Sequence, residues 1–381
     1  MDLNLILGII IGVIVLVILV AVHELGHGIV ARRNGVVLEE FGIGFPPRAF
    51  ARKLKNGVLF SINWLPLGGF VKLQGEHDSA NKKGDYGAAT YWQKTKILLA
   101  GVLVNWVVAA FLLTVLALVG LPKIVPNQFS IASDTHQVSE PVVLSSIVKD
   151  YPAAKAGLQN GDKVVAVNNE RIDSVEEFIS LSEANRGKTV ALTYSRGGED
   201  KVVSVALRDT EAATFGSTLS QKKLIRATWS APIVGIATTG QFTWVTIQGL
   251  GQLASDFVTG LVFRLSPDAD TRKEADVNLA AAGNSVAGPI GILGTIFPAA
   301  SKAGPAEVLF LAAIISLTLA VMNTLPIPAL DGGRWFVMTI YKLRKKKLTK
   351  EREEKIQAIG FTSLMVLILV ITIGDVTKIF R

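Results

Sequence analysis

The stretch LNLILGIIIGVIVLVILVAVHELGHGIVARR, residues 3–33, decides the fold class. Its apolar part, Leu3–Ala31, exceeds the roughly 20 residues that a helix needs to cross a bilayer. It lacks a basic leader and a small-residue cleavage site, so we interpret it as a retained helix rather than a signal peptide. Ionisable side chains are costly inside such a span and need a partner or a role. The sequence His23-Glu24-Leu25-Gly26-His27 therefore predicts a functional site inside a membrane helix.

The spacing of this motif is typical of zinc hydrolases. Histidines four residues apart lie one turn apart on the same helix face, so both imidazoles can bind one cation. Glu24 adjoins the first histidine and can act as general base toward a water at the open position of the metal. The alternative is that these side chains merely lie on a helix, and the apolar surroundings disfavour it. The chain has no cysteine, so a third ligand must be a carboxylate or another histidine.

Asp331 is the strongest candidate for that third ligand. It lies in NTLPIPALDGG, residues 323–333, where two prolines disrupt helical pairing. Irregular backbone at membrane depth is tolerated only inside protein or along a wet cavity. The alternative is an aspartate that caps a helix starting at Gly332. His77 and His136 fall in a predicted cytoplasmic loop and a soluble insert, and we interpret both as ordinary surface histidines.

Composition indicates a membrane protein with a water-exposed insert. Half of the 381 residues are hydrophobic and only 18% are charged, and the apolar residues gather in blocks. The net charge of +8 concentrates beside these blocks, which fits membrane topology and argues against a nucleic-acid-binding surface. Four blocks are long enough to span a bilayer: Leu3–Ala31, Lys96–Leu121, Ala306–Ala329 and Ile356–Ile373.

The basic residues predict the orientation of these spans. Lys and Arg are frequent in residues 32–96 and 341–355, so both segments should be cytoplasmic. Residues 122–305 carry both signs of charge and should lie on the opposite side, as should both termini. If Arg32 marks the interface, His27 and His23 lie about 8 and 14 Å further in, at 1.5 Å per residue. The site should therefore lie inside the bilayer, near its cytoplasmic side.

We expect a polytopic α-helical membrane protein with four transmembrane helices, a small cytoplasmic membrane-associated β-sheet and an inserted α+β domain. Within the insert, strands are expected at 142–148, 163–168, 189–194 and 201–207, with a helix near 174–184. The predicted segments are the first transmembrane helix with HELGH (1–33), the β-region (34–95), the second transmembrane helix (96–121), the inserted domain (126–209), an amphipathic membrane-surface region (220–305), the third transmembrane helix with NTLPIPALDGG (306–341), and the basic loop with the fourth transmembrane helix (342–381).

HELGH, NTLPIPALDGG and the turn AKAGLQNGD at 154–162 together resemble the site-2 protease family of intramembrane zinc metalloproteases. The similarity is to the bacterial branch like regulator-of-sigma-E protease, with one PDZ-like domain. The resemblance implies that His23, His27 and Asp331 ligate Zn²⁺ and that Glu24 is the catalytic acid/base. It implies that Asn323 positions the substrate backbone or stabilises the oxyanion, a role that suits an amide donor. The alternative for Asn323 is a buried amide that satisfies broken-helix carbonyls.

The resemblance also gives a meaning to FGIGF (41–45) and PLGGFVKLQGE (66–76), as a membrane-associated hairpin and edge strand that hold an unwound substrate. Adding the substrate to a sheet edge replaces the hydrogen bonds of its helix, and glycine permits close backbone approach. The alternative is that the glycines only form tight turns. The predicted substrate-binding residues are Gly42, Gly44, Gly69, Phe70, Val71 and Lys72.

The predicted function is hydrolysis of a peptide bond within or near the transmembrane helix of a single-pass membrane protein, such as an anti-sigma factor or a remnant signal peptide. The expected location is a bacterial inner or plasma membrane, with the active site near the cytoplasmic side and the PDZ-like domain extracytoplasmic. The lipid bilayer and a peptide or protein ligand at that domain are the other expected partners, and no nucleic acid is expected. The alternatives are a non-catalytic scaffold that binds partners through its PDZ-like domain, and a transporter, which broken helices and buried ionisable groups would also suit.

Overall fold

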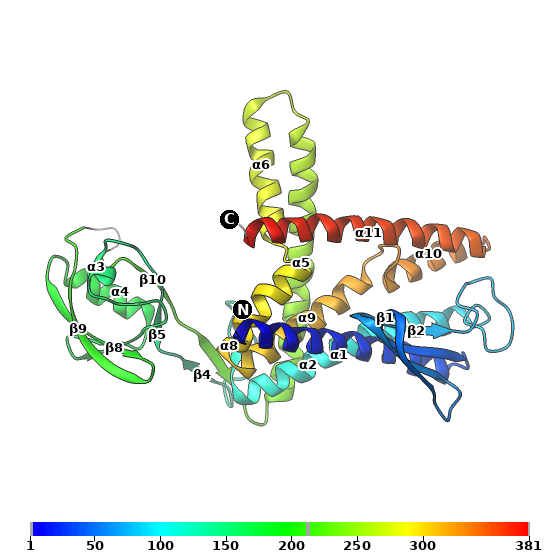
Figure 1. Ribbon diagram of the computed structural model, residues 1–381, viewed down its shortest axis with the longest axis horizontal. Coiled ribbons are helices and arrows are strands. Elements are labelled where there is room, and N and C mark those ends of the chain that lie inside the picture. The colour runs from blue at the N-terminus through cyan, green and yellow to red at the C-terminus, as the bar shows by residue number, and fades with distance from the viewer. Residues whose placement is uncertain (1–2, 211–213, 380–381) are drawn as a thin grey trace. The chain divides into compact units, whose positions relative to one another are not determined.

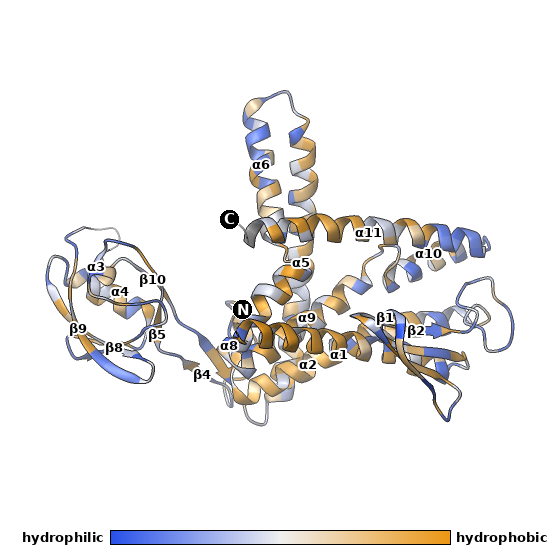
Figure 2. Ribbon diagram, in the orientation of Figure 1, coloured by the Kyte–Doolittle hydropathy of each residue, from blue (hydrophilic) through white to orange (hydrophobic). Residues whose placement is uncertain are grey.

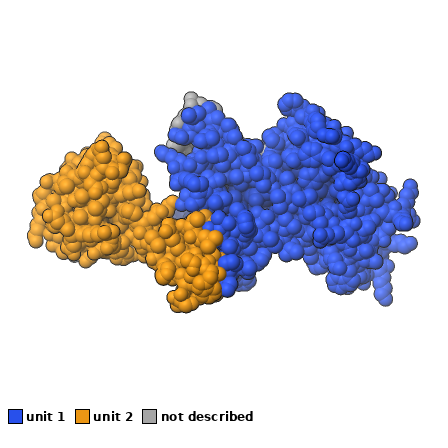
Figure 3. All heavy atoms as spheres, turned by 90° about the horizontal axis from the view of Figure 1, so that it is seen from below, with its two compact units in different colours: residues 1–115, 232–381 blue, residues 116–231 orange. Residues whose placement is uncertain are grey.

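The computed structural model describes residues 3–210 and 214–379, which form two compact units. Unit 1 comprises residues 1–115 and 232–381, and unit 2 comprises residues 116–231 (Figure 3). Unit 1 holds the long helices and a two-stranded sheet, and unit 2 holds the remaining strands (Figure 1). The candidate site lies wholly within unit 1.

In the described part of the chain, four helices are long and apolar enough to cross a membrane: α1 (Leu3–Arg33), α2 (Tyr91–Val119), α9 (Pro305–Thr324) and α11 (Lys350–Ile379). They agree in number and position with the four predicted spans. Figure 2 shows α1 and α2 as mainly hydrophobic along their length, as expected of helices that face lipid or protein. The third predicted span is interrupted, because α9 ends at Thr324 and a separate helix, α10 (Asp331–Leu343), follows.

Glycines allow helix α1 to pack closely against its neighbours. A Cβ at Gly26 would lie 3.0 Å from the carbonyl oxygen of Ala100 in α2, so these two helices approach at the level of the HELGH motif. Toward its start, α1 meets α8 (Phe297–Ala303), where a Cβ at Gly8 or Gly12 would overlap Pro298 or Phe297. Small residues at such contacts let helix backbones approach within membranes.

Strands β1 (Leu38–Lys53) and β2 (Leu59–Leu73) form the small sheet that was predicted in residues 34–95. Both strands are long and bent, and residues 40–43 of β1 pair with residues 59–62 and also with residues 69–72 of β2. Residues 69–73 of β2 therefore form an outer segment of the sheet. This outer segment lies against α1 at Glu24.

The region 220–305 differs from the series of amphipathic helices that we predicted. It begins with strand β11 (Lys223–Arg226) and continues as one long helix, α5 (Ala231–Arg264), followed by α6 (Ala269–Asn284). The first turns of α5 pack along α2: Trp106 donates to the Thr243 hydroxyl at 3.1 Å, and a Cβ at Gly235 would overlap Thr114. Small and polar residues of α5 thus contact another helix. The location of this region at the membrane surface remains a prediction.

The segment GPIGI, residues 288–292, begins a short helical stretch formed by α7 (Pro289–Gly291), the π-helical turn η1 (Ile292–Ile296) and α8. The buried carboxylate of Asp375 in α11 accepts hydrogen bonds from the amides of Gly288 and Gly291, at 3.2 and 2.8 Å. A carboxylate at a helix start satisfies free amides and interacts favourably with the helix dipole. Asp375 thereby fixes the end of α11 to this stretch.

Unit 2 contains two antiparallel sheets. Strands β3 (Leu121–Pro122), β11 and β4 (His136–Ser139) form a small sheet near the two ends of the unit. The larger sheet has the order β10-β5-β6-β8-β9, and β7 (Glu170–Arg171) pairs with β6. Its strands are β5 (Val142–Ile147), β6 (Lys163–Val167), β8 (Thr189–Arg196), β9 (Glu199–Ala206) and β10 (Ser217–Ser220).

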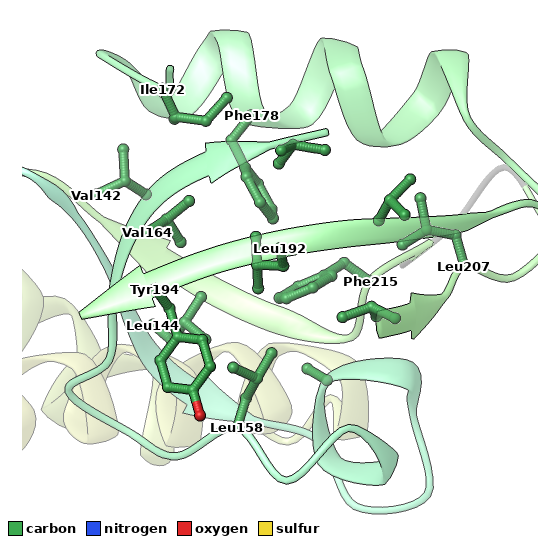
Figure 4. Close-up of a cluster of buried hydrophobic side chains, with 14 residues drawn as sticks. Val142, Leu144, Leu158, Val164, Ile172, Phe178, Leu192, Tyr194, Leu207 and Phe215 are labelled. Carbon is green, nitrogen blue, oxygen red and sulfur yellow. The ribbon is translucent and has the colours of Figure 1, made fainter. Parts of the chain in front are cut away.

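Helix α4 (Val175–Ala184), with the short α3 (Pro152–Lys155), completes this α+β domain. Ser174 caps α4 by accepting from the amide of Glu177 at 3.1 Å. The four strands and the helix predicted in this region are confirmed. The core between sheet and helices includes Phe178 and Phe215, whose rings meet edge to face at 5.0 Å (Figure 4).

The AKAGLQNGD turn has a structural role in this domain. Gly157 and Gly161 adopt positive φ values of 73° and 94°, which other residues rarely adopt, and Leu158 is buried in the core. The carboxylate of Asp162 accepts from the amide of Gln159 and, through both oxygens, from Arg196 at 2.7 Å. The motif is thus a folded turn held by an ion pair.

Candidate active site

Helix α1 brings two imidazoles together. His23 and His27 lie one turn apart and are both buried, at 7% and 8% exposure. Their rings meet edge to face with centroids 4.8 Å apart, and their Nε2 atoms are 3.2 Å apart. Both Nε2 atoms therefore point to the same place, as the four-residue spacing predicts.

Asp331 reaches the same place from the other end of the chain. Its Oδ2 lies 3.2 Å from Nε2 of His23 and 3.2 Å from Nε2 of His27. Asp331 is the first residue of α10, and Leu330 occupies the N-cap position, so the alternative of a capping aspartate is wrong. The side chain instead faces the two histidines.

The loop between α9 and α10 positions this carboxylate. A Cβ at Gly332 would overlap the carbonyl of Thr324, and a Cβ at Gly333 would overlap that of Ile327. The two glycines after Asp331 therefore let α10 begin directly against the broken end of α9. Gly360 of α11 lies equally close to the carbonyl of Pro328 on the other side.

These three side chains fit a zinc ion. Their ligand atoms all lie within 4.8 Å of one another. Zinc–nitrogen and zinc–oxygen bonds of about 2.0–2.1 Å put two tetrahedral ligands about 3.3 Å apart, close to the separations of 3.2 Å between the nitrogen and oxygen atoms here. A set of two histidines and one carboxylate, without cysteine, is also a donor set of catalytic zinc sites.

Glu24 lies beside this cluster and is hydrogen-bonded to the sheet. Its Oε2 accepts from the backbone amide of Val71 in the outer segment of β2, at 3.1 Å. A Cβ at Gly69 would lie 3.7 Å from Cγ of Glu24 and 3.1 Å from the carbonyl oxygen of Gly42. The glycine therefore permits close approach between the sheet and α1.

A cavity of about 610 Å³ opens next to these groups. Glu24, His27 and Asp331 lie in its wall together with Phe70 and Val71. The rest of its lining is mixed: apolar residues such as Leu73 and Leu98 occur beside polar ones, which include Glu76, His77, Arg334, Lys350, Glu353 and Glu354. A carboxylate, a potential metal centre and part of the outer segment of β2 thus share one hollow.

The other predicted substrate residues differ in their positions. Gly42 and Gly44 lie in β1, where Gly42 is paired with Phe70 and Gly44 has a φ of 77° close to the carbonyl of Leu65. Lys72 is exposed and forms an ion pair with Glu39 at 3.0 Å, and it does not line the cavity. Asn323 is half-buried near the end of α9 and does not line the cavity either, so its role in catalysis remains a prediction.

Sequence reasoning missed several residues around the site. His77, interpreted as an ordinary surface histidine, lines the cavity, whereas His136 is exposed on β4 as expected. Arg334 bonds to Glu76 at 3.0 Å and to Glu353 at 3.2 Å, and so joins α10 to α11 and to the loop after β2. The position of Arg334 one turn after Asp331 was the available signal.

The chain is similar to known proteins over most of its length. The model of peptidase family M50 matches residues 11–367. The zinc metalloprotease RasP of Geobacillus kaustophilus is 27% identical, over 95% of this chain and 96% of its own length. The regulator of sigma-W protease RasP of Bacillus subtilis is 26% identical, over 95% of this chain and 96% of its own length.

Among solved structures, the PDZ domain of the SdrC-like protein from Listeria monocytogenes is 24% identical and covers 24% of this chain and 93% of its own, with a TM-score of 0.19. Both RasP proteins are matched almost from end to end, so the similarity extends beyond one motif or domain. The chain belongs to peptidase family M50 and is an intramembrane zinc metalloprotease.

Proposed function

We propose that His23, His27 and Asp331 hold the zinc ion and that Glu24 is the catalytic acid/base. The observation that carries this proposal is the convergence of three ligand atoms, with Oδ2 of Asp331 3.2 Å from both imidazoles, in a cavity that Glu24 also lines. Zinc held there would supply Lewis-acid chemistry for the substrate carbonyl and the attacking water. Glu24 would accept a proton from the attacking water and later deliver a proton to the leaving amine.

We further propose that the substrate enters as a strand beside residues 69–73 of β2. A transmembrane helix must be unwound before hydrolysis because its amides are bonded internally. A strand laid on the outer segment of β2 regains such bonds at Gly69, Phe70 and Val71. A substrate carbonyl that accepts from the amide of Val71 would replace Glu24 there and free this carboxylate for proton transfer.

The proposed substrate is a single-pass membrane protein, such as an anti-sigma factor or a remnant signal peptide. One support is the cavity, which lies beside helices long enough to cross a membrane. Another is the similar protein from Bacillus subtilis, which is named regulator of sigma-W protease. Asn323 is proposed to assist with the substrate backbone or the oxyanion, on the resemblance of its motif alone. A peptide or protein ligand at the PDZ-like domain is proposed on the same basis.

The test of activity uses the full chain, reconstituted in liposomes with a panel of transmembrane peptides. Mass spectrometry should find cleavage within or next to the apolar segment of at least one peptide. Glu24→Gln keeps the size of the side chain but removes the base, and should lower the rate by about 10²–10⁴-fold. A zinc chelator should abolish cleavage, and added zinc should restore it. Equal cleavage by wild type and Glu24→Gln would disprove the assignment of Glu24.

We propose a membrane orientation with the cavity near the cytoplasmic side and unit 2 outside the cytoplasm, in a bacterial inner or plasma membrane. The basic residues around Lys346 support it. The chain has no cysteine, so a single introduced thiol reports one position. Glu170→Cys in unit 2 should react with an impermeant maleimide in intact cells stripped of their outer layers. Lys346→Cys should react only after the cells are permeabilised, and the reverse pattern would contradict this orientation.

A further inference from the structure

One face of helix α2 contacts both metal-binding histidines. Ile97, Gly101 and Asn105 are spaced four residues apart and therefore lie in one row along the helix. The carbonyl oxygen of Ile97 is 2.7 Å from Nδ1 of His27, and the side-chain amide of Asn105 is 3.2 Å from Nδ1 of His23. Between them, a Cβ at Gly101 would overlap the rings of both histidines. The row thus brings one hydrogen-bonding group to Nδ1 of each imidazole.

The position of the proton on each imidazole decides whether the group that faces Nδ1 must accept or donate a hydrogen bond. A neutral histidine that binds a cation through Nε2 carries its proton on Nδ1, and Nδ1 then needs an acceptor. His27 has such an acceptor in the carbonyl of Ile97. For His23 the neighbouring group is the Asn105 amide, which offers an acceptor through Oδ1 and a donor through Nδ2.

The two faces of this amide match the two tautomers of His23. Nδ2 of Asn105 faces Nδ1 of His23, an arrangement for the tautomer with its proton on Nε2. Oδ1 of Asn105 is buried and has no hydrogen-bond partner among the described residues. A rotation of the Asn105 amide by 180° exchanges its Oδ1 and Nδ2 atoms. Oδ1 then accepts a hydrogen bond from the protonated Nδ1 of His23. This arrangement fits the His23 tautomer that coordinates a metal through Nε2.

We infer that Asn105 is a positioning residue, which holds His23 in the tautomer and ring orientation that bind zinc. The inference rests on the proposed zinc site. Asn105 has no exposed surface, and a buried amide in an apolar helix is costly unless it is bonded. Its own backbone carbonyl accepts from Ser316 of α9 at 2.9 Å, which fixes the helix but does not involve the side chain. The side chain is thus left for His23.

The test compares zinc affinity in three purified full-length variants, by competition with a chelator of known affinity. Asn105→Leu keeps the approximate size but removes both polar atoms, and should weaken zinc binding by about 10–100-fold, as loss of such a supporting hydrogen bond does. Asn105→Asp keeps an acceptor oxygen, and should bind zinc within about threefold of wild type. Ser316→Ala removes the bond to the backbone of the same residue, and should leave zinc affinity unchanged.

The outcomes are distinguishable. Wild-type affinity in Asn105→Leu would overturn the inference, as would equal losses in Asn105→Leu and Ser316→Ala, which would indicate a packing role. Failure of the wild type to bind zinc would instead disprove the proposed site itself. Should Asn105→Leu not fold, nitrogen NMR of histidine-labelled wild type with zinc remains decisive: Nδ1 of His23 must carry a proton, and an unprotonated Nδ1 would overturn the inference.

Discussion

The backbone amide of Val71 donates a hydrogen bond of 3.1 Å to the carboxylate of Glu24, so the proposed catalytic base is held by the strand along which the substrate is proposed to bind. The amide of Leu73, two residues on, makes a longer bond of 3.4 Å to Glu76. Alternate amides of an outer strand point away from the sheet, and here they meet carboxylates. A substrate strand would have to displace them.

This relationship predicts the effect of removing the amide of Val71. Val71→Pro deletes the donor that points away from the sheet, a position where proline is tolerated in an outer strand. We expect cleavage of a transmembrane peptide to fall by about fivefold to tenfold, because one hydrogen bond contributes about 1 kcal/mol. Val71→Ala, the matched control, keeps the amide and should stay close to wild type. Equal rates for the two variants would show that this amide does not take part.

The proposed metal ligands can be tested by removal. Asp331→Asn and His27→Ala should each leave the purified protein with far less than one zinc per chain, because each deletes one of the three proposed protein ligands. His77→Ala is the control, since His77 lines the same cavity but lies outside the ligand group. Elemental analysis after dialysis measures the content. Full zinc occupancy in Asp331→Asn would contradict the assignment of this carboxylate.

Local patterns explain what the sequence could predict of the site. The spacing within HELGH determines that His23 and His27 share a helix face, whatever surrounds them. Asp331 stood out because it follows a proline-broken segment in an apolar block. Neither argument depends on how the helices pack. The distances of 3.2 Å from Oδ2 of Asp331 to Nε2 of each histidine agree with both arguments.

The residues that the sequence did not reveal depend on packing between distant segments. Asn105 is one polar residue within a long apolar helix, and only the approach of α1 to Gly101 gives it a partner. The helical periodicity of α5 was predicted, but its contacts with α2 were not, for a related reason. Its Gly and Thr residues lower the mean hydropathy, yet Gly235 and Thr243 are contacts with α2. Single-sequence periodicity records which face is polar but not which neighbour covers it.

The ion pairs of Arg334 predict a strong effect on stability. Its guanidinium stacks on the ring of Tyr86 at 4.6 Å and bonds to Glu353, whose side chain is 7% exposed. Arg334→Met would leave Glu353 buried without its cation, and should cost about 3–5 kcal/mol. Thermal unfolding in detergent should show the loss. The double variant Arg334→Met/Glu353→Leu should recover part of it, because no buried charge then remains unpaired; additive losses would contradict this account.

The Asp162–Arg196 pair predicts how the stability of unit 2 depends on pH. Burial alone would raise the pKa of Asp162, but the hydrogen bonds from Arg196 and from the amide of Gln159 hold that pKa below its ordinary value. A carboxyl whose pKa is lower in the folded state stabilises the fold above its unfolded pKa of about 4. This contribution is lost as the pH falls through the folded pKa.

Hydrogen exchange at the amides of β6 and β8 in the full chain measures this contribution. In wild type, protection should decline as the pH falls below about 4, after correction for the intrinsic exchange rate. Asp162→Asn should be less protected at pH 7 and should lack this part of the acid dependence, because an amide does not titrate. Arg171→Gln is the control, since its ion pair with Asp173 is exposed on both sides and exposed pairs contribute little. An unchanged acid dependence in Asp162→Asn would assign the titration to another carboxyl group.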